Sequence, residues 1–420
     1  MSNTLTHIET EKQLVPALRF KEFDGEWSIV TLGDTSEIVG GGTPETVNES
    51  YWNGKHQWFT PTELKSKYVS ESKRTITDLG LKKSSAKLLP KGTLLFSSRA
   101  TVGDISIALR EVCTNQGFQS FIVNEDNDNE FLYNWIIKHK NLFLKRASGS
   151  TFLEISKKEI LKLKTLIPSL TEQQKIASFL SAVDEKIQQL TKKKELLEQY
   201  KKGVMQQLFS GQLRFKDENG NPYPDWEEKR LGEIGKTFNG LTGKTKEDFG
   251  EGKPYIQYMQ IFRGSKINPD EFGFVKLNEN EKQSRAQFGD AFFTTSSETP
   301  KEIGTASVLL DKIEELYLNS FCFGYRPNNI ELLVPQFLQF LLRSEIFRRK
   351  IIPLAQGSTR YNMSKVELMK LKVDIPQKEE QQKIATYLSS IDTKIEAVNN
   401  QITQTQTFKK GLLQQMFVAA

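Results

Sequence analysis

Apolar residues in two stretches of the chain recur with the alternating four-then-three spacing of a heptad seam. The first seam consists of Ile176, Leu180, Val183, Ile187, Leu190, Leu197, Val204 and Leu208. The second consists of Ile384, Leu388, Ile391, Ile395, Val398, Ile402, Leu412 and Met416. Each seam predicts one amphipathic helix of about 39 residues. Because such a helix cannot bury its apolar stripe alone, the two are expected to pair as a coiled coil.

The two seams belong to a duplication within the chain. Residues 147–209 align with residues 355–417 without a gap, at a constant offset of 208 residues. The identical segments include Gly-Ser-Thr at 149–151 and 357–359, and Glu-Gln-Gln-Lys-Ile-Ala at 172–177 and 380–385. A duplicated chain is expected to fold as a pseudo-dimer with an approximate two-fold axis, and this symmetry makes the helix pair antiparallel.

The remainder of each half differs between the copies but follows one pattern. Short strand-like runs lie at 94–98, 105–109 and 118–123 in the first half and at 291–297, 306–310 and 321–325 in the second. An apolar helical stretch follows in both halves, at 131–143 and 335–347. These variable blocks are therefore predicted to share a fold of short strands and turns and to differ in their surface residues.

Together these patterns predict an α+β protein with two similar mixed domains, joined by two long helices that form an antiparallel, pseudo-two-fold symmetric coiled coil. The predicted segments are an N-terminal tail at 1–15, a first mixed domain at 16–155, a central repeat with the first long helix at 156–211, a second mixed domain at 212–363, and a C-terminal repeat with the second long helix at 364–420. The alternative is that both helices are core helices of one large domain. Their long polar faces disfavour it.

Composition excludes several classes of protein. No apolar run reaches the about 18 to 20 residues of a spanning helix, and the N-terminal residues lack the apolar core of a secretory signal, so we expect a cytoplasmic protein with no membrane partner. Two cysteines and three histidines, far apart in the sequence, offer no metal-binding spacing. The net charge of +6, from 58 basic and 52 acidic residues, permits nucleic-acid binding without requiring it.

Three fragments share letters with catalytic motifs but lack the required spacing. Gly-Lys-Thr at 243–245 would need a glycine where Phe238 stands to form a phosphate-binding loop. Asn-Pro-Tyr-Pro at 221–224 has the wrong order for a methyltransferase tetrapeptide, and Asp225, Glu227 and Lys229 lie too close together for a nuclease site. No acid, base and nucleophile assemble, so the chain is predicted to have no catalytic residue and no metal site of its own.

Gly- and Thr-rich loops occur in both variable blocks. A shared scaffold with divergent loops is what two recognition modules need when each reads a different target. For DNA, the side chains required are those that make hydrogen bonds to base edges or phosphates. The candidates are Thr43, Ser97, Arg99, Asn115, Gln116 and Arg146 in the first block and Lys244, Gln257, Arg263, Lys301 and Arg360 in the second. For each, the alternative is an ordinary solvated or structural polar residue.

Essentially the whole chain resembles the specificity subunit of type I restriction-modification systems. The resemblance rests on the duplicated Glu-Gln-Gln-Lys-Ile-Ala, on Lys-Lys-Gly-x-x-Gln-Gln-x-Phe at 201–209 and 409–417, and on variable blocks that begin near Trp27 and Trp226 and end at Gly-Ser-Thr. It is specific in the helical repeats and weak in the variable blocks. It implies that the variable blocks are target-recognition domains, similar in fold to those of adenine-N6 DNA methyltransferases, and that the helices act as a ruler.

The resemblance implies that the chain recognises double-stranded DNA, with each domain reading one half of a split target. The implied partners are two methyltransferase subunits and two restriction subunits, which carry S-adenosylmethionine, ATP and magnesium, while this chain binds no cofactor. It also implies that Gln173, Gln174, Gln381 and Gln382 help to bind the methyltransferase subunits, whereas the alternative is that they are ordinary first-turn helix residues. Two other functions stay open: a coiled-coil scaffold that binds proteins without reading DNA, and a nuclease or methyltransferase in its own right.

Overall fold

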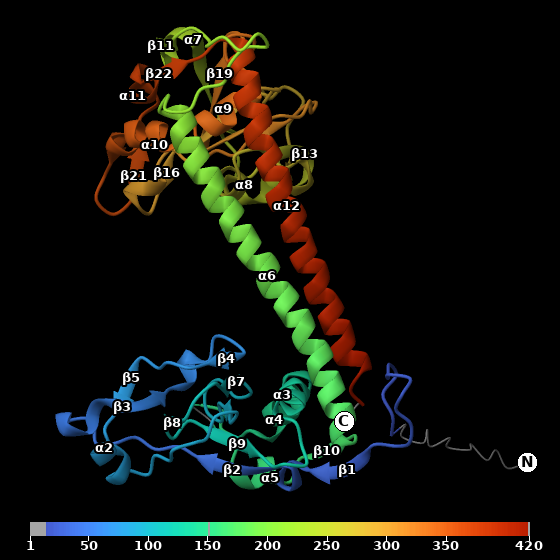
Figure 1. Ribbon diagram of the computed structural model, residues 1–420. Coiled ribbons are helices and arrows are strands. Elements are labelled where there is room, and N and C mark those ends of the chain that lie inside the picture. The colour runs from blue at the N-terminus through green and yellow to red at the C-terminus, as the bar shows by residue number, and fades with distance from the viewer. Residues whose placement is uncertain (1–13, 150–151, 419–420) are drawn as a thin grey trace, which may run out of the picture. The chain divides into compact units, whose positions relative to one another are not determined.

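The computed structural model describes residues 14–149 and 152–418. The chain divides into two compact units, one formed by the residues up to Leu190 together with those from Gln401 onwards, the other by Thr191–Asn400. Each unit contains a mixed α/β part and parts of two long helices, α6 (Leu170–Phe209) and α12 (Lys378–Gln415) (Figure 1). In the described part of the chain no helix is both long and apolar enough to span a membrane. The five segments predicted from the sequence stay a prediction, because this division falls inside the long helices.

The first unit is built on a five-stranded sheet of order β2-β9-β6-β7-β4 and a three-stranded sheet of order β5-β3-β8, with a separate pair, β1 and β10. The strands are β1 (Ser28–Thr31), β2 (Ser36–Gly40), β3 (Trp52–Phe59), β4 (Tyr68–Val69), β5 (Arg74–Ile76), β6 (Leu94–Phe96), β7 (Ile105–Ala108), β8 (Val112–Thr114), β9 (Gln119–Val123) and β10 (Lys164–Ile167). The helices are α1 (Leu32–Thr35), α2 (Asp78–Lys82), α3 (Asn129–Lys138), α4 (Lys140–Arg146) and α5 (Lys157–Leu161), with short 3-10 turns at Glu49–Tyr51 and Pro61–Glu63.

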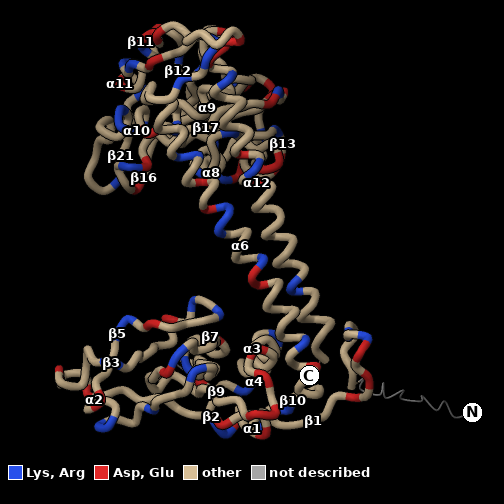
Figure 2. The backbone as a smooth tube through the Cα atoms, viewed as in Figure 1, with Lys and Arg blue, Asp and Glu red and all other residues tan. Residues whose placement is uncertain are grey.

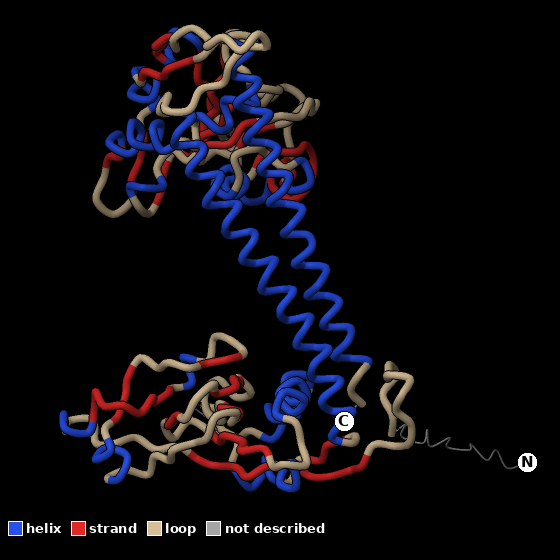
Figure 3. The backbone as a smooth tube through the Cα atoms, in the orientation of Figure 1, coloured by secondary structure: helices blue, strands red, loops and turns tan. Residues whose placement is uncertain are grey.

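The second unit repeats this plan with the sheets β12-β19-β15-β17 and β14-β13-β18, the pair β11 and β22, and a small sheet β16-β21-β20 (Figure 3). The strands are β11 (Glu227–Arg230), β12 (Gly235–Asn239), β13 (Phe249–Ile256), β14 (Gly273–Val275), β15 (Ala291–Thr294), β16 (Ser296–Ser297), β17 (Ala306–Val308), β18 (Tyr317–Leu318), β19 (Cys322–Pro327), β20 (Ala355–Gln356), β21 (Tyr361–Met363) and β22 (Lys372–Ile375). The helices are α7 (Leu231–Ile234), α8 (Tyr258–Arg263), α9 (Pro335–Leu341), α10 (Glu345–Ile351) and α11 (Lys365–Lys370), with 3-10 turns at Lys246–Asp248, Pro269–Glu271, Pro300–Glu302 and Ile352–Leu354.

Each core lies between a sheet, a short apolar helix and the long helices of the same unit. In the first unit α3 begins where the side chain of Asp128 accepts a hydrogen bond from the amide of Phe131 (2.8 Å), which caps the helix. Its apolar face, including Phe131 and Trp135, packs with the seam residue Leu180 of α6. The second unit has the same arrangement, in which Phe337 of α9 packs with Leu388 of α12. The predicted apolar helical stretches therefore join each sheet to the coiled coil.

The two long helices run antiparallel, and two lysines that stand at seam positions of the heptad pattern form ion pairs between them. Lys201 of α6 lies 2.6 Å from Asp392 of α12 in the second unit, and Lys409 of α12 lies 2.5 Å from Asp184 of α6 in the first. These two ion pairs are equivalent, since both the lysines and the aspartates are related by the offset of 208 residues. Most of the seam residues are buried and the others are partly buried, which confirms the predicted coiled coil.

A bidentate ion pair ties the segment before β1, and likewise the segment before β11, to the first turn of a long helix. In the first unit Arg19 donates two hydrogen bonds to the buried carboxylate of Glu172 (2.8 and 2.7 Å). In the second unit Arg214 donates two to Glu380 (both 2.8 Å). The repeated Leu-Arg-Phe triplets of the sequence therefore carry the arginine that fastens each entering segment.

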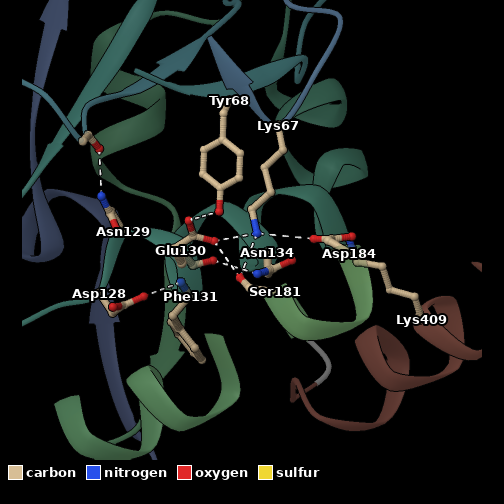
Figure 4. Close-up of polar contacts among 11 residues, drawn as sticks. Lys67, Tyr68, Asp128, Asn129, Glu130, Phe131, Asn134, Ser181, Asp184 and Lys409 are labelled. Atoms are coloured by element: carbon tan, nitrogen blue, oxygen red, sulfur yellow. Dashed lines mark hydrogen bonds and ion pairs between the residues drawn. The ribbon is translucent and has the colours of Figure 1, made fainter. Parts of the chain in front are cut away.

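In the first unit a network of polar side chains fastens β4 to the helices (Figure 4). The Nζ of the buried Lys67 lies 2.5 Å from Glu130 of α3 and 3.3 Å from Asp184 of α6. Tyr68 donates a hydrogen bond to Glu130 (2.5 Å). Burial alone would lower the pKa of Lys67, but its hydrogen bond to Glu130 and the two carboxylate charges outweigh burial and raise the pKa. The lysine therefore stays charged, and the mixed domain is held to the helix pair by charge as well as by apolar packing.

Candidate nucleic-acid interface

Four loops of the first unit meet at one end of the five-stranded sheet. The register places the end of β2 opposite the start of β9, and the end of β6 opposite the start of β7, so the loops 41–45, 97–101 and 115–117 lie at the same end. The described residues of a fourth loop, 148–149 and 152–155, are joined to them by backbone hydrogen bonds. Backbone hydrogen bonds join them: Gly42 to Thr114 (2.9 Å), Ser98 to Gly117 (2.9 Å) and Ile155 to Ser98 (2.9 Å). We call these four loops the loop cluster of the first unit.

Two tryptophans hold the glycine-rich loop of this cluster in place. The indole N–H of Trp58 donates to the carbonyl of Gly42 (2.9 Å), and that of Trp52 donates to the carbonyl of Glu45 (3.1 Å). The rings contact each other edge to face, and the guanidinium of Arg74 lies 3.5 Å from the centre of the Trp52 ring. Such anchoring restrains the backbone of the loop, and a restrained loop loses less conformational freedom when it binds a target.

The second unit has an equivalent loop cluster, formed by residues 240–243, 295–302, 319–321 and 356–362. The same backbone bonds recur: Leu241 to Leu318 (2.7 Å), Thr295 to Phe321 (3.1 Å) and Met363 to Thr295 (3.0 Å). Because these bonds match those of the first unit one for one, the two clusters share a backbone frame, and positions can be compared between them.

The glycine of the repeated Gly-Ser-Thr lies in this frame in both units, and its backbone conformation explains why it recurs. Gly149 and Gly357 have positive φ angles of 133° and 119°. A Cβ at Gly149 would lie 2.2 Å from the carbonyl oxygen of Phe152, and one at Gly357 would lie 2.3 Å from that of Arg360. Any other residue would clash with the backbone there, so the glycine lets each loop turn tightly.

The cluster of the second unit contains a hollow of about 440 Å³, lined by Tyr258, Met259, Phe262, Ser296, Ser297, Glu298, Glu302, Phe321 and Arg360. The rings of Tyr258 and Phe262 are stacked, with centroids 6.4 Å apart. Burial raises the pKa of Tyr258, whose hydroxyl donates to the carbonyl of Ser296 (2.9 Å). Flat rings beside one exposed arginine are suited to nucleic-acid bases and phosphates.

Most of the predicted DNA-binding residues lie in or beside the loop clusters. In the first unit Thr43 donates a hydrogen bond to Gln116, and Arg99 forms an ion pair with Glu154 (3.7 Å) while remaining half exposed. Asn115 is partly buried and accepts a hydrogen bond from the amide of Gly117 (2.9 Å), so it shapes the loop. Arg146, at the end of α4, is paired instead with Glu159 of α5 (3.1 Å). In the second unit the exposed residues are Gln257, Arg263, Lys301 and Arg360.

Two predicted DNA-binding residues are wrong, because they are enclosed. Ser97 is fully buried, and its hydroxyl is hydrogen bonded to Thr101 (2.9 Å) and to the carbonyl of Arg99. The Lys244 side chain is only 5% exposed, and its Nζ lies 2.5 Å from Glu281. Both residues occur in glycine-rich loops, which is why composition pointed to them. Their side chains turn inward and support those loops.

The ion pair of Lys244 predicts a pH-dependent stability difference. The hydrogen bond from Lys244, together with those from Gln283 and the amide of Asn278, lowers the pKa of Glu281 to about 2, from 4.5. These bonds therefore stabilise the fold above pH 4.5, and the effect is lost as the pH falls towards 2. We expect K244A to be less stable than wild type at pH 7, with the difference shrinking between pH 4.5 and 2, in urea unfolding. The exposed K301A is the control. If K244A were as stable as wild type at pH 7 and bound DNA more weakly, Lys244 would belong to the DNA interface after all.

The four glutamines expected to bind partner subunits divide into two pairs. Gln173 is buried, accepts from the amide of Asp128 (2.9 Å) and donates to the carbonyl of Pro168 (3.0 Å). Gln381 is also buried and makes the equivalent bonds to Val334 (2.9 Å) and Pro376 (2.8 Å). These two therefore join the long helices to α3 and α9 of their own unit, which corrects the expectation. Gln174 and Gln382 are exposed, and for them partner binding stays a prediction.

The neighbours Gln381 and Gln382 provide a matched test. Q381A leaves the buried amide of Val334 without its acceptor, so we expect it to lower the free energy of unfolding by about 1–3 kcal/mol. Q382A removes an exposed side chain, and the expected change is within about 0.5 kcal/mol. Urea unfolding of both variants measures the difference. A stable Q381A variant that fails to assemble with partner subunits would contradict the correction.

Charge and metal-binding groups add little to this picture. Lysines and arginines are interspersed with acidic residues in both units (Figure 2). The distribution of charge therefore does not locate the interface, whereas the loops do. Among the described residues no three His, Cys, Asp or Glu side chains are grouped as a metal site would need. Placement of the cofactors on partner subunits stays a prediction.

Sequence reasoning missed the aromatic residues of the interface, namely Tyr258, Phe262 and Phe321 in the second unit and Phe152 in the first. Phenylalanine is more often buried than exposed, so the residue type alone gave no signal. A signal was present for Phe152, since it directly follows the repeated Gly-Ser-Thr and stands where the other copy has Arg360.

Comparisons with known proteins agree over most of the chain. The family model described as type I restriction modification DNA specificity domain matches residues 24–199 and 223–405. The type I restriction enzyme MjaIX specificity subunit of Methanocaldococcus jannaschii is 32% identical over 304 residues, which cover 67% of this chain and 70% of that protein. The MjaVIII specificity subunit of the same organism is 25% identical over 413 residues, covering 94% of each chain.

Solved structures share the fold. The S subunit of a type I restriction-modification system from M. genitalium has a TM-score of 0.57 at 18% identity, covering 97% of this chain and 100% of that one. A second structure, described as addressing complex assembly and conformational transition of the type I system, has a TM-score of 0.58 at 18% identity and covers 93% and 96%. Both cover the mixed parts as well as the long helices of this chain.

Proposed function

The chain belongs to the family of type I restriction-modification DNA specificity subunits, and we propose that each of its units reads one half of a split double-stranded DNA target. A specificity subunit is the non-catalytic, DNA-recognising component of such a system. The proposal that each unit reads one half of the target goes beyond membership of the family. It is supported above all by one observation: both units carry the same loop cluster on the same backbone frame, with different side chains on it.

The side chains of the two clusters suit base reading. Arg99 and Arg360 are exposed on loops and can make bidentate hydrogen bonds, while Gln116 and Gln257 offer amide groups. Because corresponding positions of the frame carry different residues, the two half-sites are expected to differ in sequence. Lysines and arginines elsewhere on the units would bind phosphates, which makes affinity fall with salt.

The partners and the setting follow from the family as proposals. Two methyltransferase subunits would bring S-adenosylmethionine and methylate adenine at N6 in each half-site, and two restriction subunits would use ATP and magnesium. The exposed Gln174 and Gln382 would contribute to the contact with the methyltransferase subunits. The helices α6 and α12 would set the gap between the half-sites, since each begins in one unit and ends in the other. Because its target would be DNA, we expect the chain to act in the cytoplasm.

Modified-base sequencing tests the proposal. DNA is compared between cells that express this chain with its methyltransferase subunit and cells that lack only this chain. The expected result is a split motif methylated on adenine in each half and absent from the second sample. The opposing result is no chain-dependent methylation although the methyltransferase is active with another specificity subunit. DNA affinity that does not fall with salt in a filter-binding assay would instead favour a protein scaffold.

A further inference from the structure

The two most exposed phenylalanines of the described residues lie one in each loop cluster. Phe321 is 65% exposed and Phe152 is 58% exposed. Phe408, at 55%, comes next and lies on α12, outside both clusters. Single exposed apolar residues are common on proteins. What requires an explanation is that both lie on the surfaces that are expected to read DNA.

The shared frame shows that neither ring is a requirement of the fold. The backbone position of Phe321 is occupied in the first unit by Gly117, since both carbonyls accept the equivalent bond, from Thr295 and from Ser98. The position of Phe152 is occupied in the second unit by Arg360, because each follows its positive-φ glycine by three residues. The two units therefore reach the same result, one exposed ring in the cluster, from different loops.

Each ring also lies beside an exposed arginine. Phe321 and Arg360 line the same hollow in the second unit, together with the stacked Tyr258 and Phe262. In the first unit the loop of Phe152 is joined to the loop of Arg99 by the backbone bond from Ala100 to Leu153 (3.0 Å) and by the ion pair of Arg99 with Glu154. Each cluster thus combines a cation that can hold DNA with an apolar ring that has no hydrogen bond to offer.

We propose that Phe321 and Phe152 are wedges, each of which inserts between neighbouring base pairs of the half-site that its unit reads. A ring without polar groups gains most from DNA where it replaces base stacking, and proteins that open or bend DNA use phenylalanine in this way. The base that a methyltransferase modifies has to leave the stack, and a wedge beside it lowers the cost of that step. The sequence preference of the wedged step then adds to specificity without hydrogen bonds to bases. The inference depends on the proposed function, since it concerns the same two surfaces.

The test uses 2-aminopurine, a base analogue whose fluorescence rises when it is unstacked. The analogue is placed at one position at a time in each half-site, leaving out the methylated adenine, and the duplex is saturated with the complete complex of this chain and its methyltransferase subunits. F321A, F152A and the control F408A are compared with wild type. All three side chains are exposed, so thermal unfolding midpoints are expected to stay unchanged.

With wild type, at least one position in each half-site is expected to brighten severalfold. F321A should abolish the rise in the half-site of the second unit alone, F152A in the other half-site alone, and F408A in neither. Brightening that is absent in wild type, or that survives both substitutions, overturns the wedges while leaving specific binding, and with it the proposed function, intact. Failure of the wild-type complex to bind the split site overturns both. Loss of subunit assembly in F321A or F152A would assign the rings to a protein interface and also overturn the proposal.

Discussion

Exchanging residues 16–155 for the corresponding segment of another specificity subunit is expected to change one half of the recognised DNA sequence and to leave the other half and the gap unchanged. The physical reason is that all four loops of the first cluster come from within this segment, and their hydrogen bonds to one another lie inside one unit. Modified-base sequencing of cells carrying the hybrid measures the outcome. The expected effect is a complete change of one half-site.

The boundary of the exchange matters, and a shorter exchange serves as its control. Phe152 and Glu154 belong to the loop residues 152–155, which contact the loop of Arg99. A hybrid that ends at residue 147 therefore combines loops from two proteins in one cluster, and we expect it to methylate its half-site poorly. A hybrid of 16–155 in which both half-sites change together would show that the two units do not read independently.

The substitution R214A is expected to destabilise the second unit by about 3 kcal/mol. It removes both hydrogen bonds that the guanidinium donates to Glu380, whose carboxylate is fully buried. The indole N–H of Trp226 (3.0 Å) would remain as a neutral donor to that charge. Arg214 also donates to the carbonyls of Tyr223 and Pro224, so its loss also releases the segment that leads into the mixed domain. Urea unfolding measures the change.

Three further variants separate the buried pair from an ordinary surface charge. R19A removes the equivalent partner of Glu172 in the first unit and should cost a similar amount. R214K keeps the charge but lacks the planar guanidinium that donates two hydrogen bonds at once, so an intermediate loss of stability is expected. R349A breaks an exposed pair with Glu345 and should cost less than about 1 kcal/mol. A loss in R214A no larger than that in R349A would mean that water enters and solvates Glu380.

The predicted coiled coil shows what the periodicity of apolar residues determines by itself. The seam residues were read correctly because a heptad pattern is local and each copy displays it independently. Lys201 and Lys409 stand at seam positions where the pattern lacks an apolar residue, and the heptad spacing alone does not indicate their partners. Their partners, Asp392 and Asp184, lie on the other helix, and it takes the pairing of the two helices to bring them together.

Some residues that were assigned the same role from the sequence differ in burial in the structure. Gln381 and Gln382 are adjacent and were assigned one role, but one side chain points into the unit and the other away from it. Ser97 and Arg99 were both taken from one loop as DNA contacts, and only the arginine is exposed. Residue type and loop context identify the segment that carries a site. The direction of each side chain depends on what packs against it.

The sequence by itself determined the duplication, the two long helices, the shared plan of the variable blocks and the family, because each depends on local patterns or on the comparison of one copy with the other. The tertiary structure alone decided which loops form one surface and which side chains they expose. Those loops are separated by up to about a hundred residues and are brought to one end of a sheet by strand pairing, whose register no single segment specifies.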